Sequence, residues 1–137
     1  MRLVMIMALV ASGWVSRYDP NLMQEPIYNR THGFATPAIR QNWQGFDGYA
    51  AARYPEEIDK EYIVCPLDQE LPCLHVLVVD CAGVKDGALE WMINGHIWLE
   101  MDYNSMVQIW KKPKGGLRVN IFEYKRVEER RTEFVPY

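Results

Sequence analysis

The sequence lacks the features that mark several common functional classes. Its 15 basic residues are outnumbered by 18 acidic ones, and the resulting net charge of −3 argues against a nucleic-acid-binding surface. Cysteine and histidine are scarce, with three of each, and the CX7CX7C spacing of the cysteines fits no zinc pattern. The chain also has no Gly-rich phosphate-binding loop and no internal repeat. We therefore expect no nucleic-acid partner, no metal and no cofactor.

Long hydrophobic runs are absent as well. The apolar run from Leu3 to Val10 is far too short to cross a bilayer as a helix, so we expect no integral membrane span. The run follows Arg2 and precedes small residues, which is typical of a signal peptide and its cleavage site. Residues 1–11 are therefore interpreted as a signal peptide or an N-terminal extension, which predicts a secreted or cell-envelope protein. The alternative is an ordinary first strand.

Two apolar segments that each end at an acidic residue give the clearest structural signal in this chain of 137 residues, which we expect to be one domain and a monomer. From Leu74 to Val79 five of six residues are apolar, which predicts a strand buried on both faces and ending at Asp80. A second strand, Ile97 to Met101, ends at Asp102. With the other alternating segments, the predicted strands cover residues 12–18, 48–53, 61–65, 73–80, 97–101 and 117–124.

One helix is predicted between the last two strands. Asp102 suits the N-cap of a helix over residues 103–110, and the Pro and Gly residues that follow would end it. Residues 84–94 are expected to form a loop or one short helical turn, residues 20–45 an irregular loop, and residues 125–137 a charged tail that frays. Six strands without strand–helix alternation predict an all-β domain (with one short helix), closed into a barrel because closure removes strand edges.

One pair of cysteines is expected to lie close enough for a disulfide bond if it is oxidised. Cys65 and Cys73 flank the segment PLDQELP, whose prolines and Asp suit a hairpin connection, so their Cα atoms should lie within bridging distance. Cys81 is left over. An odd count weakens a disulfide framework, and buried free thiols are the alternative.

Five segments carry a resemblance to a known family. They are, in order, ASGWVSRYDP, GYAAARY, HVLVVDCAGV, IWLEMDYNSMVQIW and LRVNIFEY. Taken as an ordered set, they resemble the strands of the RlpA-like double-psi β-barrel superfamily, which is related to expansins and lytic transglycosylases. The resemblance spans nearly all of residues 11–124. It implies a six-stranded double-psi β-barrel over residues 12–124.

What the resemblance implies about function is cell-wall polysaccharide chemistry, typically on peptidoglycan. In the enzymes similar to lytic transglycosylases, an acid protonates the glycosidic oxygen and the sugar's own hydroxyl then attacks, without hydrolytic water. Asp80 matches the family acid, although Asp80-Cys81-Ala82-Gly83 stands where the family has Asp-Arg-Gly-Pro. Ala51-Ala52-Arg53 likewise stands where the family has Ala-Ala-His.

The sequence thus predicts a secreted, cell-wall glycan-active domain, lytic transglycosylase-like or expansin-like, with Asp80 as general acid and base. The alternative is a non-catalytic barrel that binds glycan or a protein partner, or serves a structural role. Asp80 could instead pin its own loop, and Asp102, the second catalytic candidate, could instead be a helix cap. The candidates for stacking on sugar rings are Trp14, Tyr18, Tyr49 and Trp91, with Trp98 as a further aromatic residue that could lie in the core.

Overall fold

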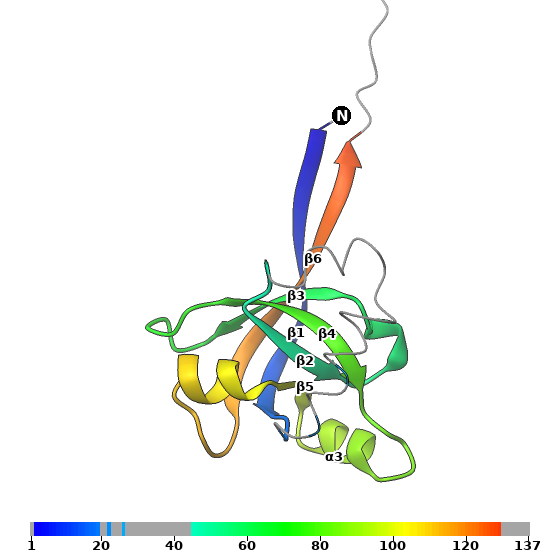
Figure 1. The fold of residues 1–137 in the computed structure, drawn as a ribbon, viewed down its shortest axis with the longest axis vertical. Coiled ribbons are helices and arrows are strands. Elements are labelled where there is room, and N and C mark those ends of the chain that lie inside the picture. The colour runs from blue at the N-terminus through cyan, green and yellow to red at the C-terminus, as the bar shows by residue number, and fades with distance from the viewer. Residues whose placement is uncertain (1, 20–21, 23–25, 27–44, 130–137) are drawn as a thin grey trace, which may run out of the picture.

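The structure, a computed structural model, describes residues 2–19, 22, 26 and 45–129. Its strands close into one barrel in the order β1-β5-β2-β4-β3-β6 (Figure 1). The strands are β1 (Arg2–Arg17), β2 (Gly48–Ala52), β3 (Glu61–Pro66), β4 (Leu74–Cys81), β5 (Ile97–Met101) and β6 (Leu117–Glu129). The helical segments are η3 (Pro55–Glu57), α3 (Ala88–Asn94) and η4 (Asn104–Ile109).

The strand pairing has an internal two-fold pattern. Two pairs are parallel, β1 with β5 and β2 with β4, and the other four pairs are antiparallel. Exchanging β1 with β4, β2 with β5 and β3 with β6 reproduces the same set of pairs. Two interlocked halves of three strands, each giving a parallel partner to the other, form the double-psi arrangement. The prediction of a six-stranded double-psi β-barrel is confirmed.

The barrel interior is filled by apolar side chains that alternate along the strands with outward-facing ones. Trp110 is the largest fully buried side chain, and its indole Nε1 donates a hydrogen bond to the carbonyl of Pro72 at 2.8 Å. As the sequence predicts for a strand buried on both faces, β4 also has a covered outer face. There Leu77 and Val79 are packed against the half-buried aromatic residues Tyr18, Phe46 and Tyr49.

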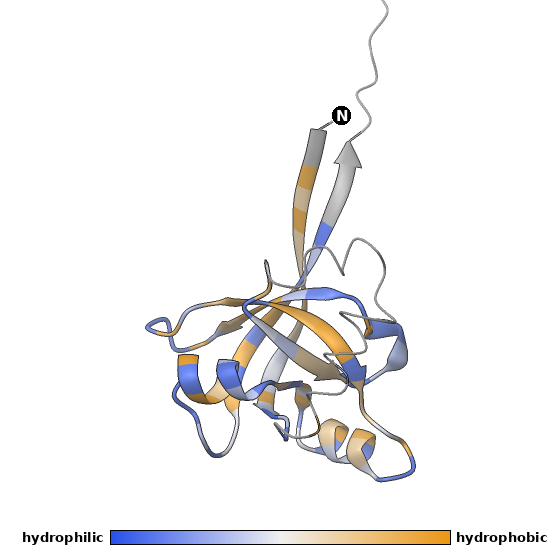
Figure 2. Cartoon of the chain, in the orientation of Figure 1, coloured by the Kyte–Doolittle hydropathy of each residue, from blue (hydrophilic) through white to orange (hydrophobic). Residues whose placement is uncertain are grey.

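Strands β2 to β5 lie within one or two residues of their predicted bounds, but β1 and β6 are both longer than predicted. β1 begins at Arg2 rather than residue 12, and β6 continues to Glu129 rather than fraying from residue 125. The extra lengths pair with each other as a two-stranded ribbon that projects from the barrel (Figure 1). The β1 strand of this ribbon carries hydrophobic residues (Figure 2), and apolar side chains between Met5 and Val10 are exposed. The signal-peptide interpretation of residues 1–11 stays a prediction.

The helical segments also differ from expectation in kind. The predicted helix over 103–110 is present as η4, but it has π-helical geometry, with Trp110 N donating to Ser105 O five residues back. The seven-residue α-helix is α3, where only a loop or one turn was predicted. The irregular loop predicted at residues 20–45 lies almost entirely outside the described residues. No described helix is long and apolar enough to cross a membrane.

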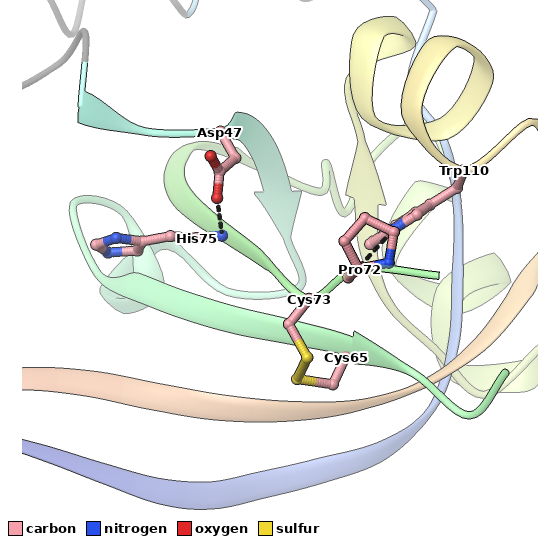
Figure 3. The surroundings of a disulfide bond; sticks show 6 residues. All are labelled: Asp47, Cys65, Pro72, Cys73, His75 and Trp110. Atoms are coloured by element: carbon pink, nitrogen blue, oxygen red, sulfur yellow. Dashed lines mark hydrogen bonds between the residues drawn. A yellow bond between two sulfur atoms is a disulfide. The ribbon is translucent and has the colours of Figure 1, made fainter. Parts of the chain in front are cut away.

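The predicted disulfide is present between Cys65 and Cys73, whose Cα atoms are 4.2 Å apart (Figure 3). It links the end of β3 to the residue before β4, so it closes the hairpin that these strands form. Cys81 is free, as expected for the leftover residue. Asp47 braces the same hairpin by accepting a hydrogen bond from the backbone N–H of His75 at 2.8 Å.

We expect reduction of this disulfide to lower the free energy of unfolding by about 2 to 3 kcal/mol, because the bridge removes the closure entropy of a loop of roughly nine residues. Urea unfolding of the chain, followed by tryptophan fluorescence with and without reductant, measures the difference. A Cys65→Ser/Cys73→Ser variant should match the reduced protein, and a Cys81→Ser variant should respond to reductant like the unaltered chain. An unchanged urea midpoint on reduction would contradict the prediction.

Candidate functional site

Asp80 lies at the carboxyl end of β4, half-buried on the outer wall of the barrel. Its Oδ2 accepts a hydrogen bond from the hydroxyl of Tyr18 at 2.7 Å, and its Oδ1 accepts one from the backbone N–H of Cys81 at 2.9 Å. Both oxygens therefore act as acceptors, as they do in a carboxylate. These contacts fix the orientation of the side chain but leave it reachable from outside the barrel.

Glu100 is the acidic neighbour of Asp80, and the two are brought together by strand register. Ala51 of β2 pairs with Asp80 of β4 on one side and with Glu100 of β5 on the other. Ala51 and Glu100 alternate with core residues, and the register shift between Ala50 and Ala51 passes over Val79 and places Asp80 opposite Ala51, so all three side chains face away from the barrel interior. Neighbouring strands are about 4.8 Å apart, which puts the Cα atoms of the two acids about 10 Å apart. Ala51, the residue between them, is 3 % exposed.

The surroundings of Glu100 oppose its negative charge. Burial, and then the nearby charges of Asp80 and Asp86, raise the pKa of the Glu100 carboxyl above its ordinary value. The row of register partners Asp80, Ala51 and Glu100 continues to Ser16 of β1, which pairs with Glu100. Ser16 Oγ is buried and has no hydrogen-bond partner among the residues that the structure describes. The row therefore places a buried hydroxyl without a partner among the described residues next to an acid whose pKa is raised, and acids perturbed in this way are candidates for a functional site.

Tyr18 and Tyr49, two of the predicted stacking residues, make different contacts near this row of acids. Tyr18 follows β1 and reaches Asp80 with its hydroxyl; burial and then the hydrogen bond to Asp80 raise its pKa, so it stays a proton donor in that bond. Tyr49 packs on Leu77 and Val79, and burial followed by the charge of Asp102 raises its pKa to about 12. Tyr18 is thus part of the acid site, and Tyr49 is mainly part of the outer apolar cluster.

Asp102 is placed differently from Asp80. It is buried, with 7 % of its surface exposed, and its oxygens accept hydrogen bonds from Tyr49 N, from Ser105 N at 2.9 Å and from Ser105 Oγ at 3.0 Å. It therefore caps the start of the η4 segment and ties it to β2. A Cβ atom at Gly48 would lie 2.5 Å from Asp102 Oδ2, so glycine is required beside this junction. These contacts favour the capping interpretation.

Arg53, at the position of the His in the RlpA-like proteins that the sequence resembles, also has a structural role. Its guanidinium donates to the carbonyls of Ile97 at 2.7 Å and Met92 at 3.3 Å, and it stacks 3.8 Å from the centroid of the Trp98 ring. It therefore anchors α3 to the start of β5. One face of Trp98 is covered by this contact and is closed to a sugar.

The other two predicted stacking residues, Trp14 and Trp91, are exposed and line one cleft of about 520 Å³. This cleft lies between α3, the end of β1 and the loop that leads into β6. Ser16 connects this cleft to the row of acids, because it lines the cleft and is the register partner of Glu100. The aromatic cleft and the acid row are therefore contiguous along β1.

No group of three His, Cys, Asp or Glu side chains in the described residues is arranged to hold a metal ion. His75, for instance, is a hydrogen-bonded hairpin residue: its Nε2 lies 2.9 Å from Glu61 Oε1 and its ring contacts Phe46 and Tyr124.

The sequence analysis identified Asp80 but missed Glu100. In the strand IWLEM, Glu100 reads as the ordinary solvent-facing residue of an alternating pattern. The available signal was weak, because Glu100 is merely the only charged residue of that strand. Only the pairing of β2 with both β4 and β5 reveals that Ala51 separates two acids. No protein-family model matches this chain and a search of curated proteins finds no match, so its function is inferred from the geometry of this site and from the sequence resemblance.

Proposed function

We propose that this barrel is a cell-wall glycan-active domain, and that Glu100 and Asp80 together perform its acid–base chemistry. The observation that carries the proposal is the pair itself: two carboxyl groups on one outer row, one held toward its protonated form and the other accepting hydrogen bonds through both oxygens. Pairs of acids whose environments differ in this way divide the roles of proton donor and charged partner in glycosidases.

In the proposed reaction Glu100 is the general acid. It donates its proton to the glycosidic oxygen as the bond from that oxygen to the anomeric carbon breaks. A hydroxyl group of the same sugar forms the new bond to the anomeric carbon, and its proton returns to the Glu100 carboxylate, so no water is consumed. Asp80, held by Tyr18, stabilises the positive charge that develops on the sugar ring. This assignment moves the acid role from Asp80, the sequence-based candidate, to Glu100.

The substrate class rests on the resemblance to RlpA-like domains and on the aromatic cleft beside the acid row. Exposed Trp14 and Trp91 offer the flat apolar faces on which sugar rings stack. Peptidoglycan is the first substrate to test, because it is typical of the resembling family. A location outside the cytoplasm fits this substrate and the Cys65–Cys73 disulfide, since such bonds persist in oxidising compartments.

The test is release of soluble sugar fragments from purified peptidoglycan by the full chain and by an Asp80→Asn variant. We expect Asp80→Asn to lower the rate about 10²- to 10⁴-fold, because the neutral amide cannot stabilise positive charge in the same way. Sedimentation with insoluble peptidoglycan should be unchanged, since stacking does not need that charge. The control is Glu56→Gln, an exposed acid on η3.

Three outcomes separate the alternatives. Cleavage that Asp80→Asn abolishes and Glu56→Gln leaves intact supports the proposal. Binding without cleavage by the unaltered chain would favour a binding barrel, for which Arg53 in place of the family His is the structural reason. Neither binding nor cleavage would overturn the glycan proposal.

A further inference from the structure

The cleft lined by Trp14 and Trp91 is positively charged, whereas the chain as a whole is acidic. Among the described residues that line it, the only charged ones are Arg17 and Lys114, both basic and both exposed. A third cation, Arg118, lies 5.8 Å from the centroid of the Trp14 ring. The whole chain carries a net charge of −3, so this local excess of positive charge selects for an anionic ligand.

The shape of the cleft suits a ring. Its volume of about 520 Å³ is within the usual range of roughly 300 to 1,000 Å³ for sites that hold small molecules. Trp14 and Trp91 are 39 % and 52 % exposed, so each presents open ring surface rather than a packed one. They come from β1 and α3, two elements far apart in the sequence.

The loop that leads into β6 holds Trp14 in position. A Cβ atom at Gly116 would lie 3.0 Å from the Val15 carbonyl oxygen and 3.1 Å from Cε3 of the Trp14 ring, so only glycine allows this close approach. Gly115 beside it has a φ of +76°, which favours glycine too. Lys114 therefore lies beside the Trp14 ring, on the turn formed by these glycines. One wall of the cleft is formed before any ligand arrives.

We propose that this cleft is a binding subsite for a sugar unit that carries a carboxylate. The ring stacks on the exposed tryptophans, and the carboxylate pairs with Arg17 and Lys114. The inference rests on the proposed glycan function for its biological substrate. Through Ser16, which lines the cleft and pairs with Glu100, a chain bound here continues toward the acid row.

The first test is direct binding of a defined probe to the full chain, followed by tryptophan fluorescence and by calorimetry at low and high salt. Glucuronic acid is the probe, and glucose is its neutral counterpart. We expect glucuronic acid to bind at least about tenfold more tightly, and the difference to shrink with salt, since charge-assisted hydrogen bonds discriminate by about this factor. Equal affinity for the two sugars would overturn the proposal.

The second test uses variants with matched controls. Arg17→Gln/Lys114→Gln should abolish the preference for the acid, whereas Lys125→Gln, an exposed lysine on β6 away from the cleft, should keep it. Trp91→Ala should weaken both sugars, whereas Tyr103→Ala, a comparably exposed aromatic residue outside the cleft, should not. Retention of the acid preference in Arg17→Gln/Lys114→Gln would place the carboxylate elsewhere and overturn the proposal.

The two proposals fail separately. Binding of glucuronic acid by a chain that leaves peptidoglycan uncut supports the subsite and counts against the catalytic function. Cleavage of peptidoglycan that is unaffected by Arg17→Gln/Lys114→Gln supports the catalytic function and overturns the subsite. Tighter binding of uridine monophosphate than of glucuronic acid would also overturn it, in favour of a nucleotide site.

Discussion

We expect the Glu100→Gln variant to lose glycan cleavage and, at neutral pH, to become more stable than the unaltered chain. The loss of cleavage should be about 10²- to 10⁴-fold, the usual contribution of a general acid, because the amide has no transferable proton. The gain in stability follows from the surroundings of Glu100, whose charged form is opposed by burial and by Asp80 and Asp86. Gln has almost the same shape and never carries that charge.

The sign of the pH dependence follows from proton binding. The pKa of Glu100 is raised in the folded chain, so between its ordinary value and that raised value the folded state binds more protons than the unfolded state. In this range the free energy of unfolding falls as pH rises. The gain from Glu100→Gln should therefore be absent below about pH 4, where the carboxyl is protonated in both states, and present at pH 7.

Urea unfolding of both proteins across this pH range measures the gain, and fragment release from peptidoglycan measures the loss. Glu56→Gln, with an exposed acid, should change neither quantity. A Glu100→Gln variant that is less stable at pH 7 and still cleaves would show that Glu100 serves the fold. Lower activity together with higher stability is the combination that a purely structural role does not produce.

The core of the barrel could be predicted from local patterns, whereas its ribbon could not. Strand β4 is apolar on both faces, and its ends are marked by Pro72 and Asp80, so its bounds were visible in the sequence. The run from Leu3 to Val10 has no alternation and equally fits a signal peptide. Its partner, the charged end of β6, lies more than a hundred residues away. Neither segment contains a sign of the other, because strand pairing at that distance leaves no periodic pattern in either one.

The acid site shows the same limit. Asp80 follows an obvious strand, and Asp102 precedes a helix that needs a cap, so the sequence drew attention to both. Their roles were decided by contacts with distant residues. Tyr18 and Glu100 surround Asp80, whereas Tyr49 and Ser105 enclose Asp102. Asp80 and Asp102 are alike in local sequence context. Only the register of β2 between β4 and β5 shows that Asp80 is a reachable carboxylate and Asp102 a buried cap.

The Asp102→Ala variant should lower the free energy of unfolding by about 3 to 5 kcal/mol. The substitution leaves the backbone N–H groups of Tyr49 and Ser105 without acceptors, together with the Ser105 hydroxyl, at a buried junction. Each buried donor left unsatisfied costs about 1 to 3 kcal/mol. Urea unfolding at pH 7 measures the loss.

Two companion variants separate a structural Asp102 from a catalytic one. Gly48→Ala leaves every carboxylate in place but puts a methyl group against Ser105 Oγ and Asp102 Oδ2, so it should destabilise the same junction. Asp102→Asn keeps one acceptor oxygen, so its loss of stability should be smaller than that of Asp102→Ala. Below their unfolding transitions all three variants should cleave glycan at rates close to the unaltered chain, because the Glu100 and Asp80 row is intact in each. An Asp102→Asn variant with full stability and no cleavage would instead make Asp102 a member of the catalytic pair.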